Sequence, residues 1–123
     1  MLMPVTIPEV LVQYAQNCPE LEGAVVASRD GLVLGATERF AGDAPAAAAA
    51  SLWVHLEQDL ALIQQSVVNE SLLWTETGVW YLCRLQYDHL LLAHSRSAGS
   101  AGAMRLAGQI AAQQLARMLS KVG

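Results

Sequence analysis

The segment 23–36 is the part of this chain that most restricts its fold. It reads GAVVASRDGLVLGA, in which two short runs rich in Val, Ala and Leu flank the pair Asp30-Gly31. Asp-Gly suits the two positive φ angles of a type I′ turn, whose twist matches that of paired antiparallel strands. The pattern therefore predicts a β-hairpin, against which the other elements have to pack.

Composition limits the architecture and the class of partner. The chain has 123 residues, of which 54% are hydrophobic, so we expect a single domain over residues 1–123 with a substantial core. Charged residues make up only 15%, against roughly 25% in an average soluble domain, which indicates that a partner covers some apolar surface. The net charge is -4 and the seven basic residues are scattered, so nucleic acid is not expected as a partner.

The same sequence argues against membrane insertion and secretion. The longest uncharged internal stretch, residues 44–56, is shorter than the roughly 20 residues that a membrane span needs. The first ten residues, MLMPVTIPEV, carry no basic residue and no cleavage pattern of a signal peptide. We therefore expect a cytoplasmic location, where Cys18 and Cys83 are buried thiols rather than a disulfide.

Two helices are predicted near the ends of the chain. Thr6 can cap a first helix, with Glu9 completing a capping box and Pro8 in the first turn, and Pro19 follows the end of that helix. Residues 98–121 predict a last helix. Small residues recur there at every fourth position and would let it lie close to a sheet or to another helix: Gly99, Ala103, Ala107 and Ala111.

A central helix is expected over residues 45–65, which are rich in Ala and Leu and contain no further Gly or Pro. At 100° per residue, its apolar side chains fall on two separate stripes. Large side chains form one stripe (Leu52, Trp53, Leu56, Leu60, Ile63), and small ones form the other (Ala47, Ala50, Val54, Ala61). Two stripes imply two packing partners, and the polar residues His55, Gln58 and Asp59 lie between the stripes on one side.

Three strand-like runs follow, at residues 67–76, 79–86 and 89–95, and turn pairs separate them. They predict an antiparallel meander. The last two runs are apolar on both pleat faces, which is typical of strands covered by helices on both sides. The first run is expected to be an edge strand whose Leu72 and Trp74 are available to a neighbouring chain.

The element order is helix, two strands, helix, three strands, helix (αββαβββα), an α+β arrangement. With the run from Gly23 to Leu34, this order resembles the Roadblock (dynein light chain) family, whose signature is G-hydrophobic-hydrophobic-x-S-x-D-G-hydrophobic. The resemblance implies a profilin-like fold, in which helices sandwich a five-stranded antiparallel sheet. It also implies homodimers that join sheet edges and cross their second helices.

For function, the resemblance implies a regulatory platform. Bacterial relatives bind small Ras-like GTPases, some as GTPase-activating partners, and eukaryotic ones are adaptors in dynein or in lysosomal signalling scaffolds. The activators reposition the GTPase's own groups. Arg29, Arg39 and Arg96 are predicted in loops without an evident supporting shell, and an arginine inserted into a partner is left open.

A search for reactive groups predicts no enzyme, no cofactor and no metal. The only lysine is Lys121, so there is no GxxxxGK[ST] phosphate loop. His89 and His94, five residues apart, fall on opposite pleat faces and are interpreted as turn or surface residues. Cys83 lies in an apolar run, where burial raises the pKa of a thiol. A zinc site and a thiol enzyme remain as weaker alternatives.

We therefore expect a homodimer that recruits a Ras-like GTPase. The expected dimer interface consists of Ala47, Ala50, Val54, Ala61, Leu72 and Trp74, and the expected partner-binding residues are His55, Gln58 and Asp59. The alternative is a small-molecule-sensing or scaffold domain on a similar sheet, with a ligand near Trp80 and His94.

Overall fold

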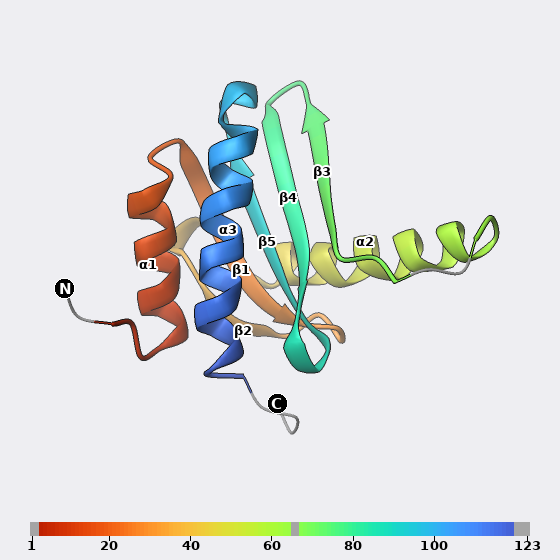
Figure 1. Cartoon of the computed structure of the whole chain (residues 1–123), viewed down its shortest axis with the longest axis horizontal. Coiled ribbons are helices and arrows are strands. Elements are labelled where there is room, and N and C mark those ends of the chain that lie inside the picture. Colours follow the sequence, from red (N-terminus) through yellow and green to blue (C-terminus); the bar gives the residue numbers. More distant parts are fainter. Residues whose placement is uncertain (1–2, 65–66, 120–123) are drawn as a thin grey trace.

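A five-stranded antiparallel sheet forms the centre of the computed structural model, which describes residues 3–64 and 67–119 (Figure 1). The strands are β1 (Leu21–Ser28), β2 (Val33–Ala36), β3 (Glu70–Thr75), β4 (Gly78–Leu85) and β5 (His89–Ser95), in the spatial order β2-β1-β5-β4-β3. The predicted hairpin and meander are therefore confirmed. β3 is an edge strand, as predicted, and β2 forms the opposite edge.

Helices cover both faces of the sheet, in the predicted order αββαβββα. Helices α1 (Ile7–Asn17) and α3 (Ala101–Ala116) pack on one face, and α2 (Asp43–Ala61) packs on the other (Figure 1). Short 3₁₀ turns lie at Glu38–Phe40, Gln86–Asp88 and Ala98–Ser100. None of the helices in the described part of the chain is long and apolar enough to cross a membrane.

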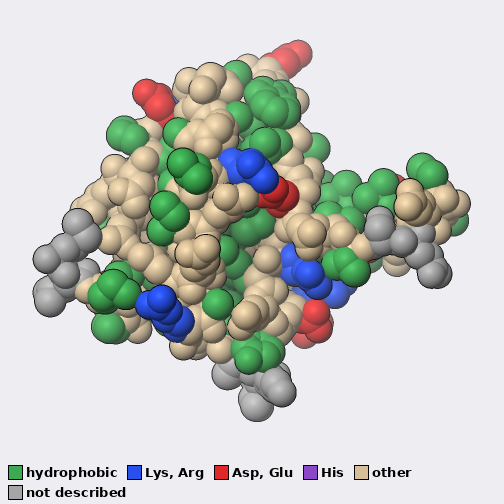
Figure 2. Space-filling view, in the orientation of Figure 1, with side chains coloured by type: hydrophobic (Ala, Val, Ile, Leu, Met, Phe, Trp, Pro, Cys, Tyr) green, Lys and Arg blue, Asp and Glu red, His purple; other side chains and the backbone are tan. Residues whose placement is uncertain are grey.

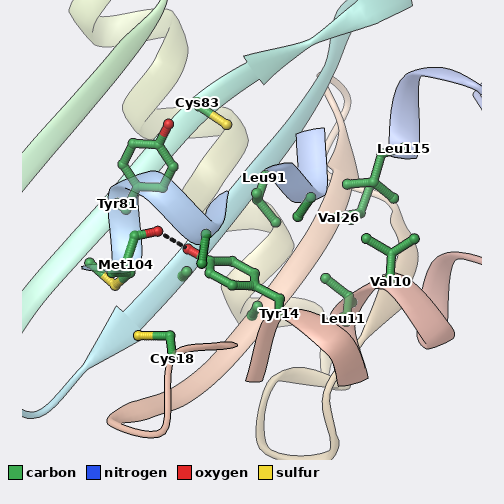
Figure 3. Packing of buried hydrophobic residues seen from close by; sticks show 14 of the residues in the cluster. Val10, Leu11, Tyr14, Cys18, Val26, Tyr81, Cys83, Leu91, Met104 and Leu115 are labelled. Atoms are coloured by element: carbon green, nitrogen blue, oxygen red, sulfur yellow. Dashed lines mark hydrogen bonds between the residues drawn. The ribbon is translucent and has the colours of Figure 1, made fainter. Parts of the chain in front are cut away.

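The core is divided by the sheet into two clusters. Leu91 of β5 points into the cluster beneath α1 and α3, whereas Leu90 and Leu92 point into the cluster beneath α2. The first cluster is built around Tyr14, whose hydroxyl donates to the Met104 carbonyl at 2.9 Å and so joins α1 to α3 (Figure 3). Both faces of the central strands are buried, which explains their uninterrupted apolar sequence.

Helix α1 begins where its cap predicts. The Thr6 hydroxyl oxygen accepts from the Glu9 backbone N–H at 3.3 Å, and the same hydroxyl donates to the Glu9 carboxylate at 2.9 Å. At the other end, the Cys18 N–H donates to the Tyr14 carbonyl at 3.0 Å. The cap therefore fixes the start of α1, with Pro8 in the first turn, where a missing N–H costs no helical hydrogen bond.

The predicted type I′ turn at Asp30-Gly31 is wrong. Gly31 has a φ of +87°, but Asp30 does not share the positive φ that a type I′ turn requires. Ser28 pairs with Leu32 across a three-residue loop, since its carbonyl accepts from the Gly31 N–H at 3.0 Å and its N–H donates to the Leu32 carbonyl at 2.9 Å. A register shift between Val26 and Ala27 accommodates the additional loop residue.

The bounds of α2 and α3 also differ from the prediction. α2 begins two residues before Pro45, because the first turn of a helix tolerates proline, and it ends at Ala61. The predicted ends of the two helices, at Gln65 and at Lys121, lie outside the described residues. The same holds for Ser66, next to Gln65. β3 is likewise shorter than the predicted run 67–76.

The small residues predicted for the last helix have two different environments, and Gly99 lies in the 3₁₀ turn before α3. Ala107 and Ala111 are buried against the sheet, as predicted, whereas Gly99 and Ala103 are exposed. The closest approach is at Gly108 instead, where an added Cβ would lie 2.6 Å from Cε2 of Tyr81 and 2.9 Å from the hydroxyl oxygen of Tyr14. Gly108 therefore lets the two tyrosines fit beneath the helix.

We predict opposite effects for the same substitution at two positions of α3. Gly108→Ala should lower the free energy of unfolding by about 1–3 kcal/mol, because the methyl group overpacks the core. Gly102→Ala should raise it by up to about 1 kcal/mol, because an added Cβ meets no atom within 4 Å there and alanine favours the helix. Urea unfolding at one fixed protein concentration measures both, and equal effects would contradict the packing argument.

Candidate functional site

Helix α2 continues past the sheet that it covers. Figure 1 shows that its C-terminal end projects beyond β3, and Figure 2 shows hydrophobic side chains over this projecting end. Trp53 is fully buried, but Leu60 is 41% exposed, and Ile63, in the turn that follows the helix, is 84% exposed. The predicted stripe of large side chains is therefore buried only in part, because no strand lies beneath its second half. An uncovered apolar helix end of this kind is typical of an interaction surface.

The residues predicted for the dimer interface lie on both faces of the sheet. On α2, Ala47 and Ala61 are exposed and Val54 is half-buried, whereas Ala50 is almost fully buried within its own chain. On β3, the half-buried Leu72 and the exposed Trp74 pair with Tyr81 and Val79, which belong to the cluster beneath α1 and α3. No contact with a second chain tests this set, which stays a prediction.

Sequence reasoning missed a β3 residue that faces α2. Leu73 pairs with Trp80, and Trp80 packs against the cluster beneath α2. Leu73 is 36% exposed, so it adds apolar surface beside the projecting helix. The alternation of side chains along a strand could have indicated this, since Leu73 must point away from Leu72 and Trp74.

The predicted partner-binding residues are accessible. His55, Gln58 and Asp59 are all exposed on the side of α2 that faces away from the sheet. Nδ1 of His55 lies 2.8 Å from the Ser51 carbonyl, one turn earlier in the helix. A partner could therefore contact these three side chains together, and their role stays a prediction.

Arg29 is held in place by residues of α2 and of the β4–β5 turn, which the sequence analysis did not identify. Its guanidinium pairs with Glu57 of α2, and its Nη1 lies 3.4 Å from Oδ1 of Asp88 in the β4–β5 turn. Its backbone N–H also donates to the Asp88 carbonyl at 3.2 Å. The prediction that this arginine lacks support is therefore wrong, because residues distant in sequence provide the support.

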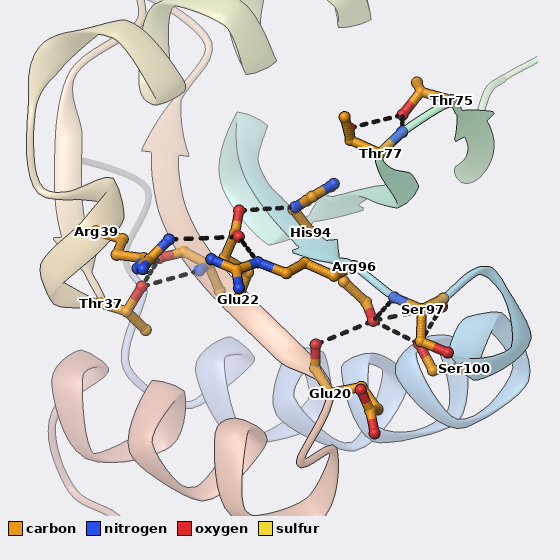
Figure 4. Close-up of polar contacts among 12 residues, drawn as sticks. Glu20, Glu22, Thr37, Arg39, Thr75, Thr77, His94, Arg96, Ser97 and Ser100 are labelled. Atoms are coloured by element: carbon orange, nitrogen blue, oxygen red, sulfur yellow. Dashed lines mark hydrogen bonds and ion pairs between the residues drawn. The ribbon is translucent and has the colours of Figure 1, made fainter.

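The Glu22 carboxylate contacts the side chains of the other two loop arginines and of a buried histidine (Figure 4). Nη1 of Arg39 lies 3.3 Å from Oε2 of Glu22, and Nε of Arg96 pairs with the same oxygen. Nδ1 of His94 lies 3.0 Å from the other carboxylate oxygen, Oε1. The hydrogen bond from Arg96 is the main cause that lowers the pKa of the Glu22 carboxyl, with His94 contributing in the same direction. These arginines also have supporting partners, contrary to the prediction.

The interpretation of His89 and His94 as turn or surface residues is wrong, because both are buried. His94 lies against Trp80 with ring centroids 4.2 Å apart, and Trp80 stacks on Phe40 at 5.9 Å. His89 places Nδ1 2.9 Å from the Gln86 carbonyl. Each ring therefore fills a position in the fold. In residues 3–64 and 67–119, no three His, Cys, Asp or Glu side chains are grouped as metal ligands would be.

Both cysteines are free and buried, as predicted. Burial raises the pKa of the Cys83 thiol to about 12 and also raises that of Cys18. A thiol with so high a pKa carries almost no thiolate at neutral pH, so Cys83 is poorly suited to act as a nucleophile.

The sheet order and the helices on its two faces define a Roadblock-type fold, as the hairpin motif and element order predicted. Myxococcus xanthus MglB superposes with a TM-score of 0.78 over 91% of this chain and 93% of that one, at 14% identity. A structure described as MglB with a tetrameric arrangement superposes with a TM-score of 0.79 over 90% of this chain and 85% of that one, at 24% identity. A Roadblock/LC7 domain from Streptomyces avermitilis superposes with a TM-score of 0.78 over 94% of this chain and 100% of that one, at 16% identity.

No protein-family model and no curated protein matches the sequence. The likeness at these identities therefore concerns the fold, which is shared over nearly the whole chain.

We predict that Glu22 contributes stability that acid removes. A carboxyl whose pKa is lower in the folded state stabilises the fold above its unfolded pKa of about 4.3, and this contribution disappears as the pH falls through the lower folded value. The unfolding midpoint of wild type should therefore exceed that of Glu22→Gln at pH 7, and the difference should shrink toward pH 3. Glu20→Gln, at a neighbouring exposed position, is the control; a constant difference for Glu22→Gln contradicts the assignment.

Proposed function

We propose that this protein is a non-catalytic homodimeric platform that regulates or tethers a small Ras-like GTPase. The observation that carries the proposal is the apolar end of α2, which projects uncovered beside the edge strand β3. The Roadblock-type fold shared with the MglB structures supports the same class of function. The assignment of a GTPase as the partner rests on the resemblance of the hairpin motif to the Roadblock family.

A second copy of the chain fits this surface better than an unrelated partner does. An edge strand presents unpaired backbone N–H and C=O groups, which antiparallel pairing with the β3 of a second copy would satisfy. A twofold axis perpendicular to the sheet keeps equivalent faces together, so both α2 helices lie on the same side. Leu60, Ile63 and Leu73 of each copy would then be covered together.

The polar side of α2 is the proposed contact for the GTPase. His55, Gln58 and Asp59 are exposed there, and the dimer would present both sets on one face. The role is non-catalytic in this proposal, because Cys83 is buried and because Arg29, Arg39 and Arg96 are engaged in ion pairs. Such a platform would act by positioning the GTPase's own groups.

The alternative, a small-molecule sensor around Trp80 and His94, has weaker support. These two rings contact one another, and Phe40 also stacks on Trp80. Aromatic side chains of the chain itself therefore pack around both residues.

We predict that wild type sediments as a dimer at micromolar concentration and that Leu60→Glu sediments as a monomer. The substitution places a charge in an interface that must lose its water, which is costly without a partner charge. Val12→Glu is the matched control, because Val12 is exposed on α1, which packs on the opposite face of the sheet from α2 and contacts β1 and β2. A folded wild-type monomer would refute the proposed dimer.

For the GTPase, we predict that Asp59→Arg weakens binding by about tenfold, or roughly 1.4 kcal/mol, and leaves the dimer intact. Ras-like GTPases encoded in the same genome are titrated in their GTP-loaded and GDP-loaded forms. Glu20→Arg makes the same charge change at an exposed position outside α2 and should have no effect. Equal affinity for wild type and Asp59→Arg removes this surface from the proposal. An increased hydrolysis rate distinguishes an activator from an adaptor.

A further inference from the structure

The two halves of α2 are held on the sheet to different degrees. The buried residues of the helix all lie at or before position 53: Ala46, Ala49, Ala50 and Trp53. Beyond them, the partly buried Leu56 packs against the cluster beneath the helix, and no strand lies beneath the C-terminal end (Figure 1). Burial alone therefore leaves the direction in which residues 54–61 project weakly constrained.

The β1–β2 loop, which carries the hairpin motif, touches one flank of α2 at two points. An added Cβ at Gly31 would lie 3.4 Å from the Cα of Ala47. The Arg29 guanidinium pairs with the Glu57 carboxylate. Positions 47 and 57 are ten residues apart, or about 15 Å along the helix. Two points so far apart on one flank constrain the direction of the helix axis as well as its position.

Arg29 is itself anchored at the end of the sheet. It follows Ser28, which pairs with His89 in the β1–β5 ladder, and its N–H donates to the Asp88 carbonyl at 3.2 Å. Its Nη1 lies 3.4 Å from Oδ1 of Asp88, whereas Nη2 pairs with Glu57. Because the planar guanidinium uses a different nitrogen for each carboxylate, it can hold both at once. Arg29 therefore bridges the β4–β5 turn and α2.

This bridge lies beside the predicted partner-binding residues. In residues 3–64 and 67–119, the pair with Arg29 is the side-chain hydrogen bond that joins α2 to another element, and the others of the helix join Ser51 to His55 within it. Glu57 is next to Gln58 in sequence and two positions from both His55 and Asp59. A displacement of Glu57 therefore carries the three exposed side chains with it.

We propose that Arg29 is a positioning residue for the partner surface of α2. Its bridge from Asp88 to Glu57 sets the direction in which the second half of the helix projects, and so sets the places of the predicted partner-binding side chains. The hairpin motif then aligns α2 in addition to turning the chain between β1 and β2. The inference rests on the proposed function for its partner, but it concerns contacts within one chain and does not require the dimer.

A double-mutant cycle tests this with a Ras-like GTPase that binds wild type. Arg29→Gln leaves the Glu57 and Asp88 carboxylates without their shared counter-charge, and Glu57→Gln releases α2 from the bridge. Each should weaken GTPase binding by about fivefold, and the double variant should bind no more weakly than either single variant, because all three lose the same contact. If Glu57 touched the GTPase directly, the two losses would add.

Arg117→Gln is the matched control for charge. It removes one positive charge from an exposed arginine at the end of α3, on the opposite face of the sheet from α2, and should leave GTPase binding unchanged. Urea unfolding of all variants at one protein concentration establishes that the affinities are measured on folded protein.

Hydrogen exchange of the protein without a partner gives a second reading. In Arg29→Gln and in Glu57→Gln, the amides of α2 after Trp53 should exchange at least about threefold faster than in wild type, because this half of the helix has lost its lateral support. The amides before Trp53 should keep their wild-type rates, as should all of α2 in Arg117→Gln.

Unchanged exchange after Trp53 overturns the inference, whether or not a GTPase binds. Two results of the titration also overturn it: Arg29→Gln binds the GTPase as tightly as wild type, or the two losses add in the double variant. If no Ras-like GTPase binds wild type, the proposed function fails separately, and the exchange rates alone decide whether Arg29 positions α2.

Discussion

The pairing of β1 and β4 with β5 is the interaction on which the rest of the structure depends. β5 is buried along its whole length and bonded on both edges, so it can exist only inside a sheet that is covered on both faces. One face requires α1 and α3, and the other requires α2. The helices are therefore placed by the need to cover the central strands, and the Tyr14–Met104 hydrogen bond fixes the first pair relative to one another.

The two faces are covered unequally, and the difference leads to function. α2 alone covers its face, and it crosses the strands and projects past the edge, so no strand lies beneath its C-terminal end. On the other face, α1 and α3 leave β3 uncovered. Part of the apolar surface that the low content of charged residues indicated therefore lies around this sheet edge.

Local patterns predicted the elements, whereas contacts distant in sequence decided what the patterns missed. The cap at Thr6, the hairpin motif and the apolar runs act within a few residues, so α1, the hairpin and the meander could be predicted from the sequence. The pairing of β1 with β5, which joins the hairpin to the meander, is a contact distant in sequence and was not predicted. The turn at Asp30 depended on the strand register, because the shift at Val26 added one loop residue. Partners far along the chain determined the burial of His94 and the ion pairs of Arg29, and no local pattern encodes them. The candidate partner-binding residues lie on an accessible side of α2, and their role stays a prediction.

A single association at the β3 edge would assemble the proposed binding face. Pairing two β3 strands brings the two α2 helices together on one side of the joined sheet. A partner that binds only the paired form must stabilise the pairing by mass action. Because the GTPase would favour the dimer, its binding and the pairing of the two chains would strengthen one another wherever the chain is not fully dimeric, with equal coupling in both directions.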